Sequence, residues 1–72
     1  MKYLVVIERA NGNYSAYLPD LPGCVAAGDT VEEVLQLIRR AVDMHLSGME
    51  EDGLTIPEPS ARADYVSLEK AS

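Results

Sequence analysis

A proline-set corner at residues 17–25 limits the folds open to this chain more than any other stretch of it. Its sequence, Tyr-Leu-Pro-Asp-Leu-Pro-Gly-Cys-Val, contains two prolines, Pro19 and Pro22. Because proline has no backbone N–H, neither residue can continue a β-ladder, so a strand that enters the corner ends there. Gly23 follows Pro22 and is free to take the positive φ that some turns require after a proline. The sequence therefore predicts a sharp connection between two strands.

A helix is predicted soon after the corner. Gly28 allows a sharp exit from the preceding segment, and Thr30 has Glu33 three residues on, which is the spacing of a capping box. In such a box the Thr30 hydroxyl accepts the Glu33 N–H, and the Glu33 carboxylate accepts the Thr30 N–H. An apolar stripe with spacings of three and four follows, and Gly53 provides the stop. We predict one helix over residues 31–51. The stripe consists of Val31, Val34, Leu35, Ile38, Val42, Leu46 and Met49.

Four segments have the composition of β-strands. Residues 3–7 are β-branched, aromatic or leucine, and turn-forming residues at 10–13 join them to a second strand at 14–18. A short third strand is predicted at 24–27 and a last one at 65–68. The element order is β-β-β-α-β, which predicts an α+β fold. We expect an antiparallel three-stranded meander, one long helix packed on one face, and a last strand that returns beside the first. Apolar residues on both faces of the first strand predict that it is central or covered on both sides.

The length of 72 residues indicates a single domain, residues 1–72, with its last few residues frayed. A chain this short hides only about 60% of the surface that it exposes when unfolded. Natural proteins of this size therefore add disulfides, a metal or a partner chain. The single cysteine, Cys24, excludes an internal disulfide, and one histidine gives no zinc-binding cluster. We expect a homo-oligomer, a dimer or higher, without a metal or a cofactor.

The chain is acidic, with twelve Asp and Glu residues against six Lys and Arg and a formal net charge of −6. Such a surface repels nucleic-acid phosphates and suits a basic protein partner, so we expect no direct binding of nucleic acid. No stretch approaches the roughly 18 apolar residues of a membrane span, so we expect no membrane association. The N-terminal apolar run has no signal-type cleavage site, which favours a cytoplasmic protein.

Four carboxylates, those of Glu8, Asp20, Asp29 and Asp64, are candidates for a divalent metal site. Two-metal nucleases gather such groups at one point. Nothing in the spacing indicates convergence, because Asp20 fits a turn and Asp29 a helix start. Cys24 fits a small core residue better than a nucleophile. We therefore predict no catalytic residue and no metal ligand.

Two surfaces are candidates for contact with a partner protein. The first is the corner, with Asp20, Leu21, Pro22 and Gly23. The second is the acidic run at the end of the predicted helix, with Glu50, Glu51 and Asp52. The helix dipole disfavours negative charge at a C-terminus, and a basic partner would relieve that repulsion. The alternative for the acidic run is that its side chains are simply solvated.

Together, several stretches of the chain resemble the HicB family of antitoxin-like proteins. They are residues 14–24, Tyr-Ser-Ala-Tyr-Leu-Pro-Asp-Leu-Pro-Gly-Cys, and residues 28–33, Gly-Asp-Thr-Val-Glu-Glu. Residues 54–60, Leu-Thr-Ile-Pro-Glu-Pro-Ser, resemble the segment that follows the helix in that family. The resemblance spans about residues 2–68. Its structural signature in this chain is Pro19, Pro22, Gly23, Gly28, Thr30 and Glu33.

The resemblance implies a partial RNase-H-like fold without RNase H catalysis. It also implies a domain that binds and masks HicA, a small basic ribonuclease toxin, and an acidic antitoxin suits such a partner. Fuller antitoxins of the family continue into a C-terminal DNA-binding domain that represses their own operon. The present sequence stops soon after the last predicted strand, so autoregulation is not expected of this chain alone.

The sequence thus favours a non-catalytic, cytoplasmic, HicB-like antitoxin that forms a homo-oligomer and masks a HicA-type toxin. Two alternatives stay open. One is an orphan oligomeric protein-interaction module without a toxin partner. The other is a small metal-dependent nuclease on an RNase-H-like scaffold.

Overall fold

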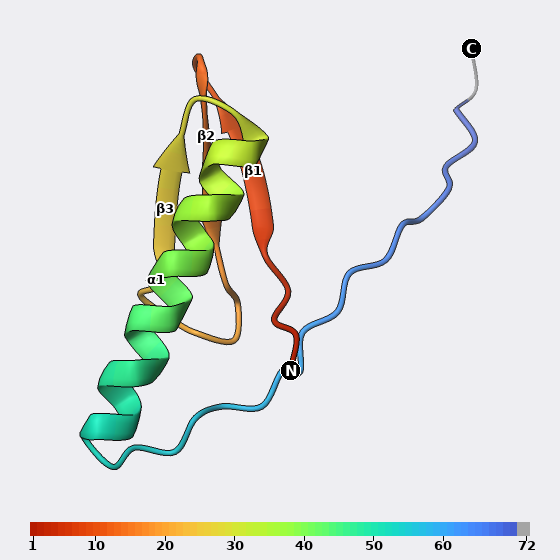
Figure 1. The fold of residues 1–72 in the computed structure, drawn as a ribbon. Coiled ribbons are helices and arrows are strands. Elements are labelled where there is room, and N and C mark those ends of the chain that lie inside the picture. Colours follow the sequence, from red (N-terminus) through yellow and green to blue (C-terminus); the bar gives the residue numbers. More distant parts are fainter. Residues whose placement is uncertain (71–72) are drawn as a thin grey trace.

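A three-stranded antiparallel sheet is covered on one face by one long helix (Figure 1). This computed structural model describes residues 1–70. The strands β1 (Val6–Ala10), β2 (Asn13–Tyr17) and β3 (Val25–Gly28) are ordered β1-β2-β3, and helix α1 spans Val31–Glu51. The predicted α+β class, the three-stranded meander and the bounds of the helix are confirmed. The likeness to RNase H stays a prediction.

A tight turn with Gly12 at φ 80° joins β1 to β2. The ladder that grows from this turn ends at the pair Val6–Tyr17. It ends there because Pro19, two residues further, has no N–H to donate. The first strand therefore starts at Val6, whereas the sequence predicts it at residues 3–7. The strand propensity of the earlier residues is present, but β2 offers them no partner.

Alternation along β2 separates a core face from an open face. Ala16 and, just after the strand, Leu18 are each 2% exposed and belong to the core, whereas Ser15 and Tyr17 are exposed on the opposite face. Full burial of a large apolar side chain contributes about 1.5–3 kcal/mol relative to exposure. The buried core consists of Ala16, Leu18, Leu21, Cys24, Val34 and Ile38.

Helix α1 packs against β3 and β2, and its last turns extend past the end of the sheet (Figure 1). The core-facing stripe of the helix centres on Val34 and Ile38, which are 0% and 2% exposed. At the C-terminus the Leu54 N–H donates to the Met49 carbonyl at 2.9 Å, and Gly53 has φ 69°. Gly53 is therefore the stop that the sequence predicts. Within residues 1–70, neither α1 nor any other segment forms a helix of the length and hydropathy needed to cross a membrane.

The start of α1 confirms half of the predicted capping box. The Glu33 N–H donates to the Thr30 hydroxyl oxygen at 3.0 Å. The Glu33 side chain lies over Gly28, and its reciprocal bond to Thr30 is not among the hydrogen bonds of residues 1–70. A Cβ added at Gly28 would lie 3.1 Å from Glu33 Oε1 and 3.2 Å from the Val34 nitrogen. The glycine is needed because β3 and the helix start approach so closely.

The prediction of a fourth strand at residues 65–68 is wrong, because these residues form no strand in the structure. Residues 62–70, which we call the C-terminal arm, have no secondary structure and run away from the sheet (Figure 1). Tyr65, Val66 and Leu68 are 98%, 81% and 86% exposed. Strand propensity shows only that a segment can pair, whereas a strand forms only where a partner edge meets it.

Strand β1 consequently lies at the edge of the sheet, whereas the sequence predicts a first strand that is central or covered on both sides. Its outer edge has no partner strand among residues 1–70. The predicted fraying of the last few residues falls partly on residues 71 and 72, which lie outside the described residues.

Two glycine-to-alanine substitutions are expected to change stability in opposite directions. Gly28→Ala forces the helix start away from β3 and should lower the free energy of unfolding by about 1–2 kcal/mol. Gly48→Ala is the control, because Gly48 lies within α1 and an added Cβ there meets nothing within 4 Å. It should raise the free energy by about 0.5–1 kcal/mol, since alanine is the better helix former. Urea unfolding followed by circular dichroism measures both values, and a neutral Gly28→Ala would contradict the account.

Candidate partner-binding surfaces

The corner between β2 and β3 is built from two consecutive β-turns. The Leu21 N–H donates to the Leu18 carbonyl at 3.2 Å, and the Cys24 N–H donates to the Leu21 carbonyl at 3.2 Å. Pro19 and Pro22 each occupy the second position of a turn, where their fixed φ fits the backbone. Both prolines therefore set the direction of the chain at this corner.

Gly23 completes the second turn with φ 89°, the positive φ that the sequence allows here and that a type II turn requires. Pro22 and Gly23 are exposed on the outside of the corner. Leu21, which the sequence groups with them as a partner contact, is only 1% exposed and lies in the core. The burial of Leu21 attaches the corner to the hydrophobic core. Of the four predicted contact residues at the corner, Pro22 and Gly23 are thus the exposed ones.

Asp20 fastens the chain that follows the helix to the corner. Its Oδ2 accepts the Ser60 N–H at 3.0 Å and the Ala61 N–H at 3.1 Å, and its Oδ1 accepts the Ser60 hydroxyl at 2.8 Å. These hydrogen bonds hold the pKa of the Asp20 carboxyl below its ordinary value, and the bond from the Ser60 backbone N–H has the largest effect. The sequence marks Asp20 as a turn residue, a possible partner contact and a candidate metal ligand. It does not predict the bonds to Ser60, because a partner 40 residues away leaves no local signal.

A second contact ties the same segment to the N-terminus. The Tyr3 hydroxyl donates to the Pro57 carbonyl. The chain after α1 passes below the sheet in Figure 1 and meets the N-terminal residues there. The corner, the N-terminal residues and the post-helical segment therefore meet at one end of the domain.

The acidic run Glu50, Glu51 and Asp52 lies exposed at the C-terminus of α1. The last turn of the helix contains no basic residue. The negative end of the helix dipole adds to these charges, so the helix end has a negative potential. The corner lies at the same end of the sheet, but α1 extends beyond it (Figure 1).

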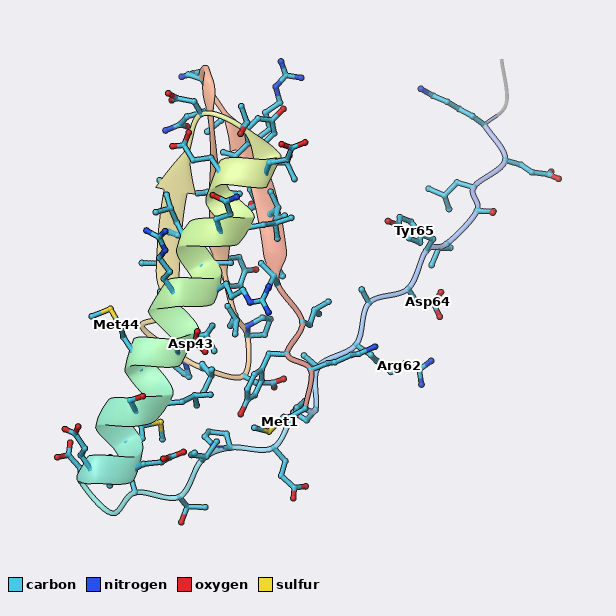
Figure 2. The ribbon with its side chains drawn as sticks, viewed as in Figure 1. Met1, Asp43, Met44, Arg62, Asp64 and Tyr65 are labelled. Atoms are coloured by element: carbon cyan, nitrogen blue, oxygen red, sulfur yellow. The ribbon has the colours of Figure 1, made fainter. Side chains whose placement is uncertain are left out.

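The four carboxylates considered as metal ligands lie on different parts of the fold. Glu8 is on β1, Asp20 is at the corner, Asp29 directly precedes α1, and Asp64 is on the arm (Figure 2). Within residues 1–70, no group of three or more His, Cys, Asp or Glu residues is placed to hold a metal ion. The nuclease alternative gains no support from the part of the chain that is described.

Cys24 is a core residue, as predicted. It is 3% exposed, and burial raises the pKa of its thiol. A neutral, enclosed thiol is a poor nucleophile.

The sequence of the chain is similar to known proteins. Residues 3–70 match the family described as HicB-like antitoxin of bacterial toxin-antitoxin system. A 14.9 kDa uncharacterized protein from the rep-hol intergenic region of Haemophilus phage HP1 is 36% identical over 66 residues, 92% of this chain and 50% of its own. A UPF0150 protein of Helicobacter pylori is 41% identical over 49 residues, 68% of each chain. Antitoxin HicB 2 of Photorhabdus laumondii is 31% identical over 64 residues, 89% of this chain and 46% of its own.

The lengths of these relatives differ. The chain spans half of the phage protein and less than half of Antitoxin HicB 2, but about two thirds of the Helicobacter protein. The similarity to the longer relatives therefore concerns one part of each.

Replacing the Asp20 carboxylate is expected to release the segment that it holds. In Asp20→Asn, the Ser60 and Ala61 amides lose a charged acceptor, so they should exchange with solvent faster while the sheet and α1 stay protected. Asp64→Asn is the control, because within residues 1–70 the Asp64 carboxylate accepts only the N–H of its neighbour Tyr65. Amide hydrogen exchange measured by NMR compares the variants, and unchanged exchange at Ser60 and Ala61 would contradict the contact.

The same contact predicts a pH dependence. The pKa of Asp20 is lower in the folded chain, so the stabilisation is fully present above the unfolded value of about 3.9 and disappears as pH falls through the lower folded value. The Ser60 amide proton shift should titrate with a midpoint below 3.9 in the native protein. It should lose this transition in Asp20→Asn. A midpoint at or above the ordinary value would refute the prediction.

Proposed function

The chain belongs to the HicB-like antitoxin family of bacterial toxin-antitoxin systems, and on that premise we propose that it binds and masks a toxin protein. The proposed toxin is a small, basic, HicA-type ribonuclease. The proposed antitoxin acts in the cytoplasm as a homo-oligomer, without catalysis and without a cofactor. Its effect is to cover the surface with which the toxin would bind RNA.

The exposed acidic end of α1 is the observation that supports this function best. A ribonuclease needs basic side chains to hold the RNA phosphates. Glu50, Glu51 and Asp52 offer such side chains a compact set of carboxylates, and the helix dipole strengthens the negative potential there. The antitoxin would thus replace the phosphates as the charge partner of the toxin and exclude the RNA sterically.

The corner is the second proposed contact. Pro22 and Gly23 are exposed, and the backbone around them is held by two turn hydrogen bonds. A surface that is already ordered loses little conformational entropy on binding. Asp20 and Leu21 support this surface from behind, the first through Ser60 and the second through its burial. We therefore assign them a positioning role within the proposed contact.

Removal of the acidic run is expected to weaken toxin binding. Glu50→Gln, Glu51→Gln and Asp52→Asn combined remove three exposed ion pairs, each of which contributes about 0.2–1 kcal/mol. The Kd for a HicA-type toxin should rise about tenfold at low salt, and the difference should shrink as salt is added. Isothermal titration calorimetry measures the affinity, and protection of RNA from the toxin measures the function.

The matched control removes the same number of charges elsewhere. Glu8, Glu32 and Glu58 are exposed and lie away from the helix C-terminus. Their replacement by Gln should leave the Kd within about twofold, because distant exposed charges are screened. An equal loss in both combinations would show that only net charge matters. If an excess of the native chain leaves RNA cleavage by the toxin unchanged, the proposed function fails.

A separate assay tests the absence of catalysis. The purified chain should not cleave RNA or an RNA–DNA hybrid in the presence of magnesium or manganese. Cleavage that is lost on Glu8→Gln or Asp20→Asn would overturn the non-catalytic proposal in favour of a metal-dependent nuclease.

A further inference from the structure

The C-terminal arm exposes three large apolar side chains within four residues. Tyr65, Val66 and Leu68 are between 81% and 98% exposed, and the arm stands clear of the sheet (Figures 1 and 2). Exposed apolar groups concentrated in this way mark a surface that binds something. In an extended backbone, Val66 and Leu68 project to one face and Tyr65 to the other. The arm therefore has the pattern of a strand with one aliphatic face.

The rest of the domain offers a site of matching chemistry at the edge of the sheet. The outer edge of β1 is unpaired among residues 1–70, and such an edge is a template for another strand. Directly before β1, between the N-terminal segment and α1, lies a groove of about 410 Å³. Tyr3 and Val5 line it from the N-terminal segment, and Leu35 and Val42 line it from α1. Leu35 is 42% exposed, so the groove has apolar surface still to be covered.

We propose that the arm of each chain pairs with the edge of β1 in a second copy, so that Val66 and Leu68 enter the groove. This arm exchange deepens the homo-oligomeric part of the proposed function and does not depend on the toxin. A twofold axis would make the contact reciprocal, since each copy gives one arm and receives one. The β1 edge of each copy closes in a single dimer. The dimer also gives this small domain the additional burial that its length calls for.

The direction of the arm favours a second copy over the chain's own β1. Asp20 holds the root of the arm at Ser60 and Ala61, and Tyr3 holds Pro57. From there the arm leaves near Met1 and runs outward, so that Asp64 and Tyr65 lie well away from the sheet (Figure 2). A fixed root and an outward course place the apolar residues where another molecule can receive them.

The charges of the arm permit this docking. The body of the domain carries the acidic excess of the chain, which would repel an acidic segment. Within residues 62–70, Arg62 and Lys70 offset Asp64 and Glu69, so the arm has no net charge. It can therefore approach the acidic body of a second copy.

Two substitutions at neighbouring positions distinguish the loss of the apolar docking face from the effect of an added charge. Leu68→Asp places a carboxylate in the groove and should raise the dimer dissociation constant at least tenfold. The reason is that each arm loses the binding free energy of about one buried leucine side chain. Ser67→Asp adds the same charge on the opposite face and should change it by about twofold or less. Sedimentation equilibrium of the purified chain measures both. A native chain that is monomeric at all concentrations, or equal effects of the two substitutions, would overturn the proposal.

Cross-linking distinguishes exchange from closure within one chain. One protein has Ser67→Cys on the arm, and a second, differently tagged protein has Val6→Cys on β1, where Val6 lies opposite Tyr17 on the open face of the sheet. Cys24 is buried, and the native chain serves as the background control. After mixing, a short bis-maleimide should link the two proteins to each other. In a second experiment, both substitutions are placed in one chain. Links found only within monomers of this chain would overturn arm exchange. The absence of links in both experiments would also overturn it.

The two proposals can fail separately. Sedimentation and cross-linking use this chain alone, whereas toxin masking is read from RNA protection. A chain that exchanges arms but leaves RNA unprotected refutes the antitoxin function and keeps the dimer. A chain that protects RNA as a monomer refutes arm exchange and keeps the antitoxin function.

Discussion

The corner from Leu18 to Cys24 is the constraint on which the rest of this structure depends. It supplies Leu18, Leu21 and Cys24, half of the six buried core residues within 1–70, although it contains no regular secondary structure. Two turns with proline in second position direct these side chains under α1. In a chain of 72 residues the core has little to spare. A loop that in most proteins only connects strands is here part of the hydrophobic core.

The corner also organises the ends of the chain. Through Asp20 it holds Ser60 and Ala61, while Tyr3 holds Pro57 on the N-terminal side. The root of the C-terminal arm is thereby fixed at the end of the domain where the corner and the N-terminal residues meet, and the course of the arm follows from this root. The same turns present Pro22 and Gly23 on the outside of the domain. One rigid element thus serves the core, the arm and the proposed contact with a toxin.

Local signals in the sequence were enough for the helix and the turns. Thr30 and Gly53 bound α1 because capping depends on residues three or four positions away, and Pro22 with Gly23 defines its turn in the same way. Strand pairing is not local, which is why β1 starts later than its composition predicts. For the same reason the predicted strand at residues 65–68 is unpaired in this structure.

The candidate contact surfaces likewise combine features that the local sequence predicts with features that depend on distant residues. The exposure of the acidic run could be predicted from charge alone. The contact between Asp20 and Ser60 could not, because it joins residues 40 positions apart. Leu21 did carry a usable signal, since a leucine enclosed by two prolines in a tight corner has few positions other than the core. Its burial moves the proposed contact outward, to Pro22 and Gly23.

Amide hydrogen exchange at Leu21 and Cys24 tests most directly whether the corner is part of the core. Both amides are bonded within the turns. If the corner unfolds only with the whole domain, their opening free energies will equal those of Val34 and Ile38 in α1. Exchange of the two corner amides at rates typical of a mobile loop, while the helix stays protected, would contradict the account.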